Sequence, residues 1–158
     1  MRFLAHRLLI LVVIFLTACQ SRPADVVLPD EFEADVYVGA WVEFWNTYDL
    51  DRVDDLFLDD ARLTYFSSEI EEIIRGLENV REHHVGFEFV PGGRAPEQEL
   101  WVEDVQSSAF ETSAVVTARW FFGDHTAPRD SVSQGPMTAV YVLHGNSYKI
   151  AHMHFANY

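Results

Sequence analysis

Cysteine and positive charge are both scarce in this chain of 158 residues. The single cysteine, Cys19, excludes an internal disulfide and a metal cluster held by several cysteines. The 11 Lys and Arg residues face 25 Asp and Glu residues, so the formal net charge is −14. Nucleic-acid binders need clustered cations to neutralise phosphates, so this charge balance argues against a nucleic-acid partner.

The chain has only one long apolar run, and it lies near the N-terminus. Residues 8–16 are continuously apolar, and Arg2 and Arg7 precede them. Nine apolar residues are too few to span a bilayer, but they match the central region of a secretory signal peptide. The next residues, Leu16-Thr17-Ala18-Cys19, resemble a bacterial lipobox, in which the cysteine becomes the lipidated first residue of the mature protein. An ordinary signal peptide that ends beside a cysteine is the alternative.

This pattern predicts a lipoprotein signal peptide over residues 1–18, a tether over 19–29 and one folded domain over 30–158. Removing the signal peptide leaves 9 basic against 25 acidic residues, a net charge of −16. Such a surface is repelled by anionic lipid headgroups, so we expect membrane attachment only through acyl chains on Cys19. The domain is then expected in the bacterial cell envelope, in the periplasm or elsewhere outside the cytoplasm.

Helical patterns precede strand patterns in the domain. Apolar residues at three- and four-residue spacing predict a long helix over about 30–48. Asp51 is expected to cap a short second helix, and Gly76 to open a third over about 77–87. Five strands are predicted, over residues 61–66, 100–107, 113–122, 137–143 and 148–155. This order predicts an α+β domain in which N-terminal helices pack on one face of a curved antiparallel sheet.

The last hairpin has a predictable register. Gly145-Asn146 is expected to form a two-residue turn, which sets the pairing of the strands on either side. Regular pairing then places His152 and His154 on one sheet face with Tyr141. Two imidazoles on one face can bind a metal, act as acid and base, or contact an anion. No third ligand stands at a recognisable spacing, so we expect no metal, and strand histidines held by hydrogen bonds are the alternative to a site.

Arg119 is the other unusual residue, because it stands inside an otherwise apolar strand. A guanidinium that points into a cavity can hold a carboxylate through two parallel hydrogen bonds, and an ion pair with an acidic side chain is the alternative. Tyr65 in the first strand would add a hydroxyl to the same cavity. His83 and His84 are expected to face solvent, as is the acidic segment 69–72.

Three segments carry a resemblance to a known family. The chain end, residues 148–155, is similar to the closing strand of the SnoaL-like and calcium/calmodulin-dependent kinase association-domain families. Residues 60–66, followed by 76–78, are a second match, and Arg119 is a third. Together with the order of elements, residues 32–156 resemble the nuclear transport factor two-like superfamily.

The resemblance implies a cone-shaped α+β barrel, usually dimeric or higher, with a pocket between the long helix and the concave sheet. Arg119 matches an arginine that lines the pocket in the kinase association domains. A second pocket arginine of that family falls at Ala139, and Phe155-Ala156 stand where those domains have Arg-Ser, so the cationic pocket is only partly kept.

The first functional hypothesis is a lipid-anchored envelope protein, homodimeric or of higher order, that binds a small carboxylate-bearing molecule without a cofactor. Its ligand-binding residues would be Arg119, His152, His154, Tyr65 and Tyr141. An isomerase or cyclase that uses a pocket histidine as general base is one alternative, and an oligomerisation or assembly module is the other. No complete catalytic set can be assembled from the sequence, which favours binding.

Overall fold

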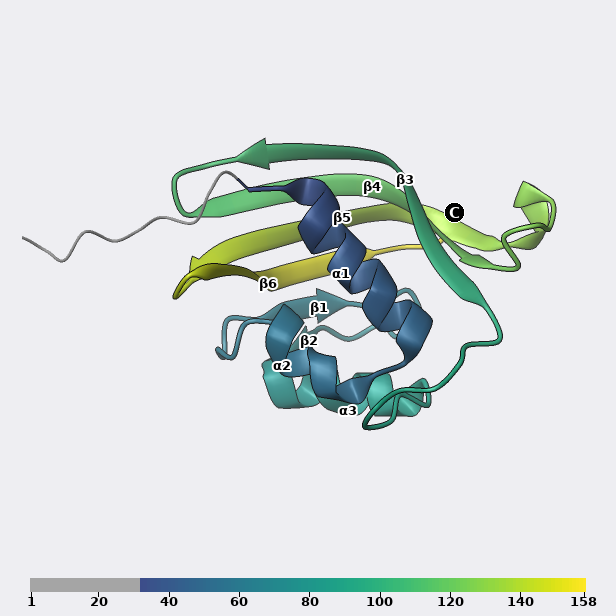
Figure 1. The fold of residues 1–158 in the computed structure, drawn as a ribbon, viewed down its shortest axis with the longest axis horizontal. Coiled ribbons are helices and arrows are strands. Elements are labelled where there is room, and N and C mark those ends of the chain that lie inside the picture. The colour runs from purple at the N-terminus through teal and green to yellow at the C-terminus, as the bar shows by residue number, and fades with distance from the viewer. Residues whose placement is uncertain (1–31) are drawn as a thin grey trace, which may run out of the picture.

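The computed structural model describes residues 32–158 (Figure 1). Cys19, the predicted signal peptide and the predicted tether lie outside the described residues. The elements are α1 (Ala34–Thr47), η1 (Leu50–Arg52), α2 (Val53–Leu56), β1 (Thr64–Phe66), β2 (Ile74–Arg75), α3 (Leu77–Gly86), β3 (Glu99–Ala109), β4 (Ser113–Gly123), η2 (Arg129–Ser131), β5 (Ser133–His144) and β6 (Ser147–Phe155). Among these, no helix is long and apolar enough to cross a membrane.

The six strands form one sheet in the order β2-β1-β6-β5-β4-β3. Five of these strands follow the prediction, whereas the short β2 was not predicted. Figure 1 shows α1 lying across the curved sheet, with α2 and α3 beyond β1 and β2. The α+β class, with helices on one face of a curved sheet, is therefore confirmed. Within residues 32–158 the sheet is open, because β2 and β3 are its two unpaired edges.

The sheet is mixed, where the prediction was antiparallel. Strand β1 pairs in parallel with β6, and every other neighbouring pair is antiparallel. Antiparallel neighbours can be joined by a short hairpin, but β1 and β6 lie at opposite ends of the chain order, so no hairpin sets their direction. Strand β6 pairs with β5 along one edge, and β1 pairs with the other edge of β6.

The helices lie close to their predicted residue ranges, but one predicted capping residue differs. Asp49, rather than Asp51, caps the segment before α2: its carboxylate accepts a hydrogen bond of 3.1 Å from the backbone N–H of Asp51. Gly76 precedes α3 as predicted, with a φ of 77° that favours glycine. Helix α1 ends at Tyr48, whose backbone N–H donates to the carbonyl of Phe44.

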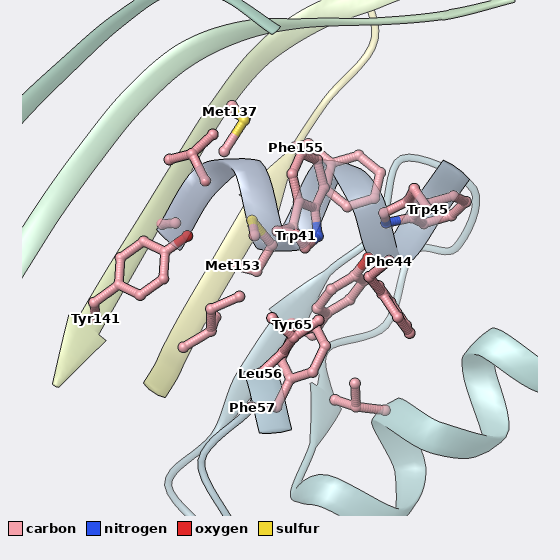
Figure 2. Packing of buried hydrophobic residues seen from close by; sticks show 14 of the residues in the cluster. Trp41, Phe44, Trp45, Leu56, Phe57, Tyr65, Met137, Tyr141, Met153 and Phe155 are labelled. Atoms are coloured by element: carbon pink, nitrogen blue, oxygen red, sulfur yellow. The ribbon is translucent and has the colours of Figure 1, made fainter. Parts of the chain in front are cut away.

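The core lies between α1 and the concave face of the sheet and is rich in aromatic side chains. Helix α1 contributes the buried Trp41, Phe44 and Trp45 (Figure 2). The two tryptophan rings pack against Phe155 of β6, and Phe44 packs against Phe57 and Phe89. In β4, the buried positions alternate along the strand and include Val116 and Trp120. The opposite, convex face of the sheet points away from the helices and is called here the outer face.

The β5–β6 hairpin contains a bulge at Ala151. The predicted turn and pairing hold from the turn as far as Tyr141, which pairs with Ile150, but Val140 pairs with His152. The extra residue exchanges the two faces of the strand beyond it. The predicted placement of His152 and His154 beside Tyr141 is therefore wrong, and the strand instead buries Met153 and Phe155.

Candidate functional site

A small cavity of about 70 Å³ lies between α1 and the sheet. Pockets that hold a whole drug-sized ligand have volumes of about 300–1,000 Å³, so this cavity admits only part of such a molecule. Its polar lining side chains are Glu69 and Ser133, and the others are aromatic or aliphatic: Trp41, Trp45, Phe87, Leu100, Trp120, Phe122 and Phe155.

Phe155 of β6 is the centre around which the cavity walls are arranged. The centroid of its ring lies 5.5 Å from that of Tyr65 and 5.7 Å from that of Trp120. The rings of Trp41 and Trp45 are 6.2 and 6.4 Å away. Figure 2 shows these α1 side chains reaching towards Phe155 from the helix. Side chains of three elements that are distant from β6 in the sequence, α1, β1 and β4, thus meet at one residue of this last strand.

Three polar atoms around Phe155 are buried without a hydrogen-bond partner in residues 32–158: the indole Nε1 atoms of Trp41 and Trp45 and the hydroxyl of Tyr65. Figure 2 shows the nitrogen of Trp45 on the side of its ring that faces Trp41. By contrast, Trp120 Nε1 donates to the carbonyl of Ala156 at 3.1 Å. Buried polar groups in proteins nearly always have a protein, water or ligand partner. An indole nitrogen only donates, so an oxygen acceptor is the partner that this set fits.

Glu69 stands at the edge of the cavity. Its carboxylate accepts hydrogen bonds from the hydroxyls of Ser67 and Ser68. Its charge acts on two neighbours: burial raises the pKa of Tyr65 and Glu69 raises it further, while burial lowers the pKa of His83 and Glu69 opposes that shift. Glu69, Tyr65 and His83 are therefore electrostatically coupled, although the sequence analysis assigned neither Glu69 nor His83 to a site.

A larger groove of about 750 Å³ adjoins the cavity, because Glu69 and Phe87 line both. It runs between the segment before β2 and helix α3. The acidic segment 69–72 is exposed as predicted, but Glu69, Ile70 and Glu72 also form part of this groove. The remaining lining residues are Ile73, Ile74, Arg75, Asn79, Glu82, His83 and Gly86.

The prediction that His84 faces solvent is wrong. Its side chain is fully buried, and its Nδ1 donates to the carbonyl of Val80 at 2.7 Å. Burial lowers the pKa of His84 from its ordinary value of 6.5 to about 3. The neighbouring His83 is half-buried, and its ring centroid lies 5.4 Å from that of Tyr65. Adjacent helical residues point in different directions, so only His83 reaches the groove.

Arg119 lies on the outer face of the sheet and does not line the cavity. Its side chain is 42% exposed and forms ion pairs with Asp104 at 2.8 Å and Glu103 at 3.5 Å. The predicted direction into the cavity is therefore wrong, and the ion-pair alternative describes the residue. Both faces of β4 carry apolar side chains, but the larger Trp120 takes the inner face, which turns Arg119 outwards.

The two strand histidines also lie on the outer face. His152 Nδ1 and the hydroxyl of Thr64 are 2.8 Å apart, which matches the alternative of a strand histidine held by a hydrogen bond. Burial lowers the pKa of His152, and His154 lowers it further. The ring centroids of His152 and His154 are 5.8 and 5.4 Å from that of Phe66. No three His, Cys, Asp or Glu side chains of the described residues are grouped as a metal site would require.

Tyr65 and Tyr141 do face the concave side, and both are buried. Only Tyr65 is in contact with the rings that wall the cavity. Tyr141 packs instead against Phe32 and Tyr37 near the start of α1, with ring centroids 5.2 and 5.9 Å away. Of the five predicted ligand-binding residues, the structure therefore packs Tyr65 against Phe155, although Tyr65 does not itself line the cavity. It leaves Tyr141 elsewhere in the core and turns the other three outwards.

Comparison with known proteins identifies the fold. No family model and no curated protein matches the chain. Among solved structures, a protein provisionally assigned as a calcium/calmodulin-dependent protein kinase type II association domain from Thiobacillus denitrificans is similar over 84% of this chain and 98% of its own, with 17% identity and a TM-score of 0.65. A protein provisionally assigned as a ketosteroid isomerase from Parabacteroides distasonis is similar over 81% of this chain and 89% of its own, with 20% identity and a TM-score of 0.63.

A nuclear transport factor 2-like superfamily protein from Salmonella enterica serovar Typhimurium is similar over 77% of this chain and 86% of its own, with 16% identity and a TM-score of 0.62. The domain therefore has the nuclear transport factor 2-like α+β cone fold, which confirms the fold implied by the resemblance in the sequence. Solved structures with this fold include proteins described as isomerases and as association domains, so the fold alone does not select a function.

Proposed function

We propose that this protein binds a small organic molecule by taking one oxygen-bearing end of it into the aromatic cavity. The observation that carries the proposal is the pair of unpartnered buried N–H groups on Trp41 and Trp45, two residues that line the cavity. A carbonyl, ether or hydroxyl oxygen placed among them would accept hydrogen bonds from the two indole N–H groups. Aromatic walls with a few convergent polar groups are typical of small-molecule sites.

The size of the cavity limits what enters it. With about 70 Å³, it holds only the end of a ligand, and the rest would lie in the adjoining groove of about 750 Å³. Binding does not depend on Arg119, which is occupied by Asp104 and Glu103 on the outer face. The ligand therefore does not need the carboxylate that the sequence analysis expected.

Binding is favoured over an isomerase or cyclase activity by the positions of the histidines. The enzyme hypothesis used His152 or His154 as general base, and both lie on the outer face, away from the cavity. His84 is a poor proton acceptor near neutral pH, because burial lowers its pKa to about 3. The likeness to a protein described as a ketosteroid isomerase concerns the fold and does not supply a base.

The proposal includes a lipid anchor and self-association. The lipobox-like residues 16–19 support attachment of the domain to a bacterial envelope membrane through Cys19. Likeness to a protein described as an association domain supports a homo-oligomer. The outer face, where Val115 and Val140 are only half-buried, is the surface we assign to contact between copies. Light scattering over a concentration series tests this part, and a monomer throughout would contradict it.

The ligand-binding part is tested with 4-methylphenol and toluene, which differ by one hydroxyl. Tryptophan fluorescence should report saturable binding of 4-methylphenol and weaker binding of toluene, because toluene has no oxygen to accept a hydrogen bond. Trp45→Phe removes one donor and should weaken 4-methylphenol binding several-fold. Trp101→Phe is the matched control, because Trp101 stacks on Phe121, with centroids 5.3 Å apart, and does not line the cavity. Absence of binding, or equal binding by both variants, would overturn the proposal.

A further inference from the structure

We infer that the ligand carries a protonated amino group and that Glu69 is the counter-ion for it at the junction of cavity and groove. This inference rests on the proposed function and names the chemical class of its ligand. It differs from the sequence-based hypothesis, which expected an anionic ligand.

The position of Glu69 is the first reason. It lines both hollows, so a ligand that extends from the cavity into the groove must pass its carboxylate. The hydroxyls of Ser67 and Ser68 hold that carboxylate in place by hydrogen bonds. Since Glu69 is exposed, an ammonium group can approach it from the groove without complete loss of hydration.

The charges of the groove are the second reason. Its lining includes the carboxylates of Glu69, Glu72 and Glu82 and a single guanidinium, that of Arg75. Arg81, on the same helix as Glu82, forms an ion pair with Asp54 at 2.6 Å and does not line the groove. The groove therefore attracts cations and repels a carboxylate.

The buried indole N–H groups are an independent reason to treat Glu69 and the other groove carboxylates as part of a binding site. Trp41 and Trp45 are at least nine-tenths buried, line the same cavity as Glu69, and carry N–H groups without a partner in the described residues. The residues that line the cavity thus include two with unpartnered buried hydrogen-bond donors and one acceptor carboxylate. A complementary ligand has an acceptor oxygen at one end and a donor cation at the other.

Both hollows also have apolar lining side chains. Phe87 lines both hollows, and Ile70 and Ile73 are large aliphatic residues of the groove that remain 43% and 39% exposed. Apolar surface of this kind favours an aryl or alkyl spacer. The structure therefore assigns to the site an oxygen-substituted aryl or alkyl amine.

Three probes with the same phenol ring test the charge of the ligand: tyramine, the neutral 4-hydroxyphenethyl alcohol, and 4-hydroxyphenylacetate. At low ionic strength and pH 7, we expect tyramine to bind at least about fivefold more tightly than the alcohol, as one partly exposed ion pair allows. 4-Hydroxyphenylacetate should bind most weakly. The difference between tyramine and the alcohol should shrink at high salt, because both charges are near solvent.

Two variants locate the selectivity. Glu69→Gln keeps the size of the side chain and should reduce the preference for tyramine over the alcohol to less than about twofold. Glu71→Gln is the matched control, because Glu71 is exposed in the same segment but does not line the groove.

The outcomes separate the two proposals. Equal affinity for tyramine and the alcohol, or a preference that survives Glu69→Gln, overturns the assignment of an amine ligand and leaves the binding site in place. Failure of all three probes to bind overturns the binding proposal as well.

Discussion

His152 lies opposite Val140 across the β5–β6 ladder, one residue away from the position that a regular hairpin would give it. The bulge at Ala151 causes this shift. It turns the two strand histidines to the outer face and turns Met153 and Phe155 into the core. Since Phe155 is the residue around which the cavity is arranged, the accommodation of Ala151 in a bulge decides which side chains of β6 form the site.

Deletion of Ala151 should leave the native faces of β6 in place. Without the extra residue, regular pairing runs from Tyr141–Ile150 directly to Val140–His152, which keeps His152 and His154 outside and Met153 and Phe155 in the core. Near-ultraviolet circular dichroism and thermal unfolding should therefore show fixed aromatic packing and a cooperative transition. Ala151→Gly keeps the number of residues and should cost only about 1 kcal/mol. A deletion variant that loses its fixed aromatic packing would contradict the assignment of Ala151 as the extra residue.

Tyr65→Phe should separate stability from binding. The hydroxyl of Tyr65 is buried without a partner in the described residues, so its removal should leave the free energy of unfolding unchanged or raise it by up to about 1 kcal/mol. The same change should leave the affinity for 4-methylphenol within about twofold, because Tyr65 packs against Phe155 but does not line the cavity. Urea unfolding and fluorescence titration measure the two effects. Destabilisation by more than about 2 kcal/mol would show that the hydroxyl has a structural partner.

His84 should make the protein less stable as the pH falls. Its folded-state pKa is about 3, whereas the unfolded chain has the ordinary value of 6.5. Between these values the unfolded state binds a proton that the folded state does not, so the free energy of unfolding decreases on acidification, by up to about 1.4 kcal/mol per pH unit. The full contribution is present above pH 6.5 and is lost progressively towards pH 3.

Urea unfolding of the native protein and of His84→Phe at several pH values between 7 and 4 measures this contribution. The variant should show a shallower dependence of stability on pH, because phenylalanine does not titrate. Equal slopes for the two proteins would contradict the assignment to His84.

Cys19 should carry the membrane anchor. In a bacterial host grown with labelled palmitate, the full chain should incorporate label and sediment with membranes, and Cys19→Ser should do neither. The −16 charge of residues 19–158 gives the unlipidated protein no attraction to anionic lipids. Undiminished labelling of Cys19→Ser would contradict the lipobox assignment.

Local patterns in the sequence determined much of the fold. The three- and four-residue spacing of apolar residues located α1, Gly76 located the start of α3, and Gly145-Asn146 located the last turn. These features depend on residues close together in the chain, so composition and spacing are enough to find them. The apolar character of Met153 and Phe155 was the one signal that could have revealed the bulge at Ala151.

Only the tertiary structure decided which faces are inside and where the site lies. Both faces of β4 carry apolar residues, and Arg119 points outwards because Trp120 fills the space under α1. His84 is buried because rings from distant segments, such as those of Phe44 and Phe57, surround it. The cavity likewise needs α1, β4 and β6 to meet. Burial depends on contacts between residues far apart in the chain, and spacing along the sequence does not contain that information.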